Sequence, residues 1–114
     1  MSTRREFLTS AAAAALVEPP PDLRTPFKYP KLVVAGSGRA GAFDEKSVDC
    51  PFVFRHGGRF WMTYIGFDGR GYQTGWASSN DLIEWKPLGL MIARDPDSPI
   101  FRHNVALTWI PPGP

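Results

Sequence analysis

The sequence predicts an all-β protein, and three features support this fold class. Short runs of β-branched and aromatic residues alternate with turn residues between residues 49 and 93. Aromatic residues make up 13% of the chain, which also contains 11 Gly and 12 Pro, a composition that favours short strands and frequent turns. No helical periodicity follows residue 20. A chain of 114 residues holds one small domain at most.

Four strands are expected, each bounded by turn residues. A buried strand rich in Phe and Val precedes Gly57-Gly58, where two glycines allow the positive φ angles of a hairpin turn. The third strand places Tyr72, Thr74 and Trp76 on one face. Four antiparallel strands within roughly forty residues form one blade of a β-propeller. The strands are predicted at residues 51–55, 60–65, 72–78 and 83–93.

Residues 18–41 are predicted to form a linker rich in Pro and Gly. The prolines between residues 18 and 30 exclude a helix or a central strand, because Pro lacks the N–H and fixes φ. Residues 31–35 (KLVVA) predict a short strand, and residues 36–41 (GSGRAG) predict a loop whose glycine spacing differs from that of phosphate-binding motifs. The partial propeller then occupies residues 42–114, with its first blade at about residues 49–93.

Residues 1–17 carry a targeting pattern. The stretch Thr3-Arg4-Arg5-Glu6-Phe7-Leu8 resembles a twin-arginine export signal, and the apolar run that follows, residues 11–17, is too short to span a bilayer. The resemblance implies the twin-arginine translocase as a partner during export, a periplasmic or extracellular location, and no stable membrane anchor. The alternative is a helical tail on a cytoplasmic protein.

Charge and cysteine content exclude several classes of function. The net charge is +2 without a cluster of Lys and Arg, so no nucleic-acid partner is expected. Cys50 is the only cysteine, and a single cysteine forms neither an intrachain disulfide nor a thiolate zinc cluster. No ligand cluster indicates a bound metal, so neither a metal nor a cofactor is expected. Asp68 and Asp81 are expected in turns.

Three segments carry a family resemblance. "DCPFVF", "GGRFWMTYIGFD" and "GYQTGWASSNDLIEWKPLG" resemble the first blade of the five-bladed β-propeller glycoside hydrolases, the family 43-like and family 32-like proteins and their phosphorylase relatives. Residues 77–85 (ASSNDLIEW) match the element A-x-S-x-D-L-x-x-W, which serves the fold in those proteins. The similarity covers about residues 42–95. It implies a first blade and, from residues 105–110, part of the next blade of a five-bladed propeller.

The same resemblance implies which carboxylates act. Glycoside hydrolysis uses two carboxyl groups, one to protonate the leaving oxygen and one to activate water or attack carbon. In the family, an Asp of the first blade is the general base or nucleophile, and a Glu of a later blade is the acid. Asp49 is the first candidate here and Asp44 the second. The alternative role for Asp49 is structural, accepting N–H bonds where a strand begins.

Four further residues are candidates for substrate binding. Trp61 and Trp76 are placed to stack on sugar rings, or else to form the core between blades. His103 and Asn104 are candidates for the rim of a cavity.

A complete five-bladed propeller needs about three times this length. The chain is therefore expected to be the N-terminal fragment of an exported glycoside hydrolase-like protein that acts on glycosidic bonds of carbohydrates. Alone it is expected to be inactive and poorly stable. The alternatives are a carbohydrate-binding propeller without catalysis, and an orphan fragment that adds its strands to a partner.

Overall fold

The structure is a computed structural model that describes residues 26–113. The chain divides into two compact units, residues 1–30 and 31–114. In the first unit only residues 26–30 are described, and they form neither helix nor strand. The predicted export signal and the first part of the predicted linker lie outside the described residues.

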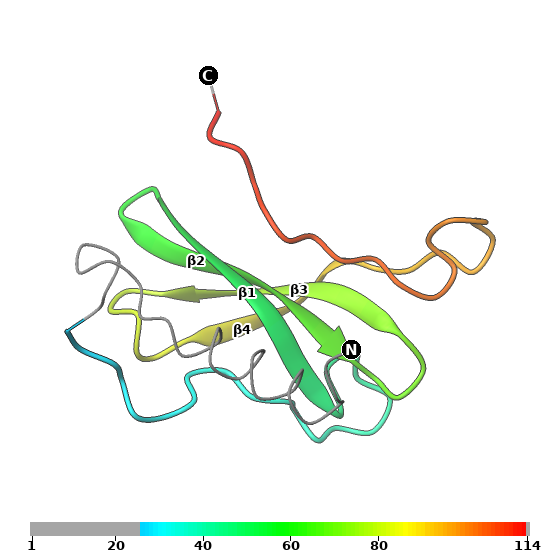
Figure 1. Cartoon of the computed structure of the whole chain (residues 1–114), viewed down its shortest axis with the longest axis horizontal. Helices are drawn as coiled ribbons and strands as arrows, with labels where there is room; N and C mark the ends of the chain where they lie inside the picture. The colour runs from blue at the N-terminus through cyan, green and yellow to red at the C-terminus, as the bar shows by residue number, and fades with distance from the viewer. Residues whose placement is uncertain (1–25, 114) are drawn as a thin grey trace, which may run out of the picture. The chain divides into compact units, whose positions relative to one another are not determined.

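The second unit is built on one four-stranded antiparallel sheet in the order β1-β2-β3-β4 (Figure 1). Within the described residues the chain is all-β, as the sequence predicts. The meander matches the expected blade closely, although each strand differs from its predicted bounds by a few residues. The strands are β1 (Ser47–His56), β2 (Arg59–Phe67), β3 (Tyr72–Ser79) and β4 (Lys86–Ile92).

The hairpin between β1 and β2 turns at two glycines, as expected. Gly57 and Gly58 have φ angles of 60° and 75°. These are left-handed values that only glycine adopts without steric cost, and two in succession suit a tight hairpin.

The turn between β3 and β4 depends on Asp81. Its Oδ1 accepts the backbone N–H groups of Ile83 and Glu84, each at 2.9 Å, which confirms the turn role expected for Asp81. The prediction that residues 83–85 begin the fourth strand is wrong, because these amides bond to the turn carboxylate rather than to β3. The strand begins at Lys86 instead.

Two other predicted strands are absent from the described part of the chain. Residues 31–35 pair with no strand; Val33 and Val34 pack instead on one face of the sheet. Residues 105–110 form no strand either. There the N–H of Val105 donates to the carbonyl of Tyr72 at 2.9 Å, and no ladder follows that bond.

The two faces of the sheet carry different side chains. The core face holds the buried residues Met62, Tyr64 and Ala77, and the ring of Phe43 covers it. On this face β2 and β3 carry Gly66 and Gly75, and a Cβ at either position would collide with the Phe43 ring. The opposite face, here called the aromatic face, comprises the half-buried residues Phe52, Phe54, Trp61 and Trp76.

Candidate functional site

Asp49 lies at an irregularity in β1. On β1 the chain advances three residues from Asp49 to Phe52, while the opposing partners on β2, Ile65 and Thr63, are two residues apart. This offset is a β-bulge. Within it Cys50 adopts a φ of 47°, a left-handed conformation that costs a non-glycine residue about 1–2 kcal/mol. Asp49 therefore lies inside β1, two residues after its start, and not at the strand's start as predicted.

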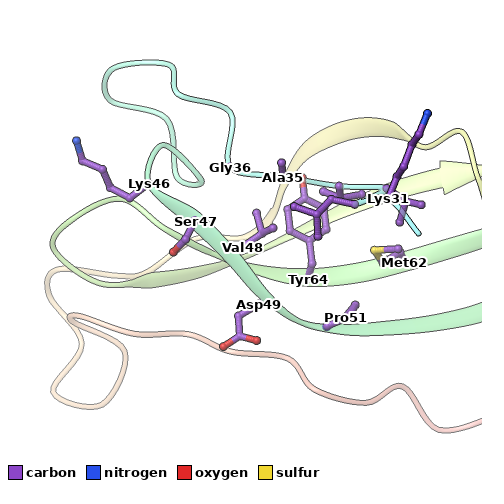
Figure 2. A pocket seen from close by; sticks show the side chains of 13 residues that line it. Lys31, Ala35, Gly36, Lys46, Ser47, Val48, Asp49, Pro51, Met62 and Tyr64 are labelled. Carbon is purple, nitrogen blue, oxygen red and sulfur yellow. The ribbon is translucent and has the colours of Figure 1, made fainter. Parts of the chain in front are cut away.

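The bulge determines how the Asp49 carboxylate is presented. Its Oδ1 accepts the N–H of Cys50 at 2.7 Å, which holds the side chain against the bulge. Asp49 is exposed, and Figure 2 shows its carboxylate turned away from Val48 and Tyr64. Bulges often re-aim a side chain beside an active site, and unfavourable backbone angles concentrate at functional sites.

We expect Cys50→Gly to be slightly more stable than Cys50→Ala, by up to about 1 kcal/mol. Both variants lose the thiol, but only glycine adopts a left-handed φ without steric cost, and part of that gain is offset by the greater freedom of glycine in the unfolded chain. Urea unfolding monitored by Trp fluorescence measures the difference. A glycine variant that is less stable than the alanine variant would contradict the strain assigned to Cys50.

Asp44 occupies a different environment. Its side chain is 5% exposed, and its Oδ1 has no hydrogen-bond partner among residues 26–113. The nearby Tyr64 is 2% exposed, and its hydroxyl also lacks a partner in the described part of the chain. Burial, and secondly the charge of Asp44, raise the pKa of Tyr64. Asp44 is therefore a buried carboxylate of the core face, whereas Asp49 is open to solvent.

His103 and Asn104 come to the same end of the sheet as the two carboxylates. That end is formed by the beginnings of β1 and β3 and the ends of β2 and β4. Asn104 Oδ1 accepts the N–H of Tyr72, the first residue of β3, at 3.0 Å. The carbonyl of His103 lies so close to Gly71 that a Cβ there would collide with it.

Trp61 and Trp76 lie elsewhere on the sheet. Their rings stack on each other at 5.6 Å between centroids and 23° between planes. Trp61 Nε1 donates to the carbonyl of His56 at 3.0 Å, which places Trp61 beside the opposite hairpin. Trp61 is four residues from Ile65, the partner of Asp49, a separation of about 13 Å along a strand. The structure does not bring the two Trp side chains together with Asp49.

The loop between β2 and β3 is fixed by Asp68, which confirms its expected turn role. Asp68 Oδ1 accepts the N–H groups of Arg70 at 2.8 Å and Gly71 at 3.0 Å. Its Oδ2 lies 2.6 Å from Arg94 Nη2. The Arg94 bond, followed by the two backbone bonds, holds the pKa of Asp68 well below its ordinary value. Sequence reasoning did not single out Arg94, because no motif marks an arginine that follows the last strand.

We expect Asp68→Asn to lower the free energy of unfolding by about 1–2 kcal/mol at neutral pH, because the pair with Arg94 is only partly exposed. The folded pKa of Asp68 is lowered, so its contribution is complete above the unfolded pKa and is lost as the pH falls through the folded value. The difference between wild type and variant should therefore narrow below about pH 4. Urea unfolding at several pH values tests this, with the exposed Asp97→Asn as control. A difference independent of pH would contradict it.

An apolar hollow of about 500 Å³ lies on the core-face side of the sheet (Figure 2). Residues 31–36 form one wall, and residues of β1 and β2, including Val48 and Met62, form the other. Asp49 belongs to its lining. The volume falls in the range of small-molecule sites.

Two other kinds of site are not found in the described residues. Among residues 26–113, no three His, Cys, Asp or Glu side chains gather closely enough to hold a metal ion. Over the same residues, no helix has the length and apolar character needed to cross a membrane.

Comparison with known proteins gives two similar solved structures. One, described as a complex of BT0996 with RGII, has a TM-score of 0.56 and 29% identity over 90% of this chain and 27% of its own. Another, described as "Glycoside hydrolase", has a TM-score of 0.52 and 28% identity over 85% of this chain and 25% of its own. No protein-family model and no curated protein matches.

These similarities support a glycoside-hydrolase-like fold for the chain. The chain spans about a quarter of the length of the solved structures that it matches. The sheet described above is therefore similar to one part of a larger glycoside-hydrolase-like protein.

Proposed function

We propose that this chain supplies the first blade of a five-bladed β-propeller that hydrolyses glycosidic bonds in carbohydrates, with Asp49 facing the substrate. The proposal is supported by the β-bulge in β1, which presents an exposed carboxylate beside a left-handed Cys50. It is supported as well by the likeness to glycoside hydrolase structures of about four times the length.

In this proposal Asp49 is the general base or the nucleophile. An exposed carboxylate that accepts one backbone N–H is held in place and keeps its other oxygen for water or an anomeric carbon. The acid is a Glu contributed by another blade. Asp44 is a buried second carboxylate whose free Oδ1 gives it the lesser claim to the same role.

The remaining expectations belong to this proposal. The export signal at residues 1–17 sends the folded protein through the twin-arginine translocase to the periplasm or beyond the cell. His103 and Asn104 lie at the sheet end that carries Asp49, which suits a place on the cavity rim. The mutual stacking of Trp61 and Trp76 favours packing between blades over stacking on sugar.

A second candidate function is carbohydrate binding without catalysis. It is favoured by the two Glu residues of the described part of the chain, Glu45 and Glu84, because neither is placed as an acid opposite Asp49. Glu45 bonds to Lys46 and to the N–H of Gly41, and Glu84 lies in the turn of Asp81. Asp49 would then accept hydrogen bonds from sugar hydroxyls.

One experiment separates these functions. The protein encoded by the complete reading frame around this sequence is expressed and assayed against a panel of aryl glycosides and natural oligosaccharides. Turnover of any member supports the hydrolase. Saturable sugar binding without turnover supports the binding function, and the absence of both contradicts each proposal.

A further inference from the structure

A polar hollow of about 510 Å³ lies at the sheet end that carries Asp49. It is formed by the residues just before β1, the loop between β2 and β3, and the residue stretch after β4. Its charged lining comprises two carboxylates and three cationic side chains, those of Glu45, Lys46, Asp68, Arg70 and Arg94.

Both carboxylates of the hollow are already engaged. Glu45 Oε1 lies 2.8 Å from Lys46 Nζ, and Glu45 Oε2 accepts the N–H of Gly41 at 3.0 Å. Asp68 accepts two backbone N–H groups through Oδ1 and pairs with Arg94 through Oδ2. Each of the four carboxylate oxygens therefore has a donor within the chain.

The cationic groups have capacity to spare. Lys46 retains further donor positions, and its side chain is 57% exposed. Arg70 is exposed, and among residues 26–113 its guanidinium forms no ion pair. Arg94 engages Asp68 through Nη2 only, while its Nη1 is buried without an acceptor in the described part of the chain. The hollow consequently carries an excess of positive charge beside Asp49.

We propose that this hollow binds the carboxylate of an acidic sugar, with Arg70 as its principal contact. Guanidinium groups match the geometry of a carboxylate and form charge-assisted hydrogen bonds with it. Lys46 and Arg94 add favourable charge at the same place. The sugar part of the inference depends on the proposed carbohydrate function, whereas the anion part depends only on the charge balance of the hollow.

The test titrates the full chain, labelled with ¹⁵N, with three probes. These are the methyl glycoside of galacturonic acid, the neutral methyl galactoside, and inorganic phosphate. We expect the uronate to shift the amide signals of Gly69 and Arg70 and to bind at least about fivefold more tightly than either other probe. Arg70→Gln should weaken uronate binding about fivefold. Arg55→Gln, which removes an exposed arginine at the other end of the sheet, should leave it unchanged.

Each other result overturns the inference in a distinct way. Equal binding of the uronate and the neutral glycoside leaves the carbohydrate function intact but removes the anion recognition. Equal binding of phosphate and uronate retains an anion site and removes the sugar. Unchanged spectra with every probe show that the hollow is not a binding site, and a spectrum without dispersed amide signals contradicts the folded hollow itself.

Discussion

Asp49→Asn is expected to lower kcat/KM toward a glycoside substrate by about 10²- to 10⁴-fold in the protein encoded by the complete reading frame, the range assigned to a general acid–base group. The substitution keeps the shape of the side chain, and the amide oxygen still accepts the N–H of Cys50. The β-bulge should therefore persist, and the loss should fall on catalysis rather than on folding. Steady-state kinetics and thermal unfolding of the same preparations measure the two effects separately.

Two further variants make this prediction specific. Asp97→Asn, at an exposed position in the stretch after β4, should leave kcat/KM unchanged. Asp44→Asn changes a carboxylate of the core face, so its effect should appear in stability. If Asp44→Asn abolishes turnover while Asp49→Asn does not, the catalytic role belongs to Asp44, and the importance assigned to the bulge is wrong.

Gly75→Ala is expected to destabilise the sheet by about 1–3 kcal/mol, the usual cost of overpacking a core. A Cβ at this position would overlap the ring of Phe43 and crowd the carbonyl of Gly89, at 3.1 Å. Phe43 is itself packed over Gly66, where an added Cβ would come within 2.6 Å of the ring, so it has little room to move. Chemical unfolding followed by Trp fluorescence gives the change in free energy.

The matched control for this prediction is Gly113→Ala, because an added Cβ at Gly113 meets nothing within 4 Å. The double variant Phe43→Ala/Gly75→Ala should lose less than the sum of its single losses, since the smaller residue at 43 makes room for the new methyl group. Strict additivity of the two losses would show that the Phe43 ring is not what Gly75 accommodates.

Local chemistry made much of the sheet predictable. The Gly57-Gly58 pair marks a hairpin because it supplies the two positive φ angles that such a turn needs. Asp68 and Asp81 are turn residues for the same kind of reason, since a short carboxylate reaches the amides that follow it. These features depend on residues within a few positions of one another, which is the range over which sequence patterns are informative.

The errors arose where the structure depends on distant contacts. Residues 31–35 have the composition of a strand but find no pairing partner in the described part of the chain, and Val33 and Val34 cover the core face instead. The β-bulge at Asp49 was missed because a register shift exists only between two strands. Arg94 was missed because its role is created by Asp68, which lies 26 residues earlier.

The most direct test of the central claim is a crystal structure of the protein encoded by the complete reading frame, bound to a sugar-mimicking glycosidase inhibitor. The account predicts that β1 lines a central cavity, that an oxygen of Asp49 lies within hydrogen-bonding distance of the inhibitor's anomeric position or of a water beside it, and that a neighbouring sheet covers Trp61 and Trp76. An inhibitor bound away from β1, with Asp49 facing outward from the cavity, would contradict it.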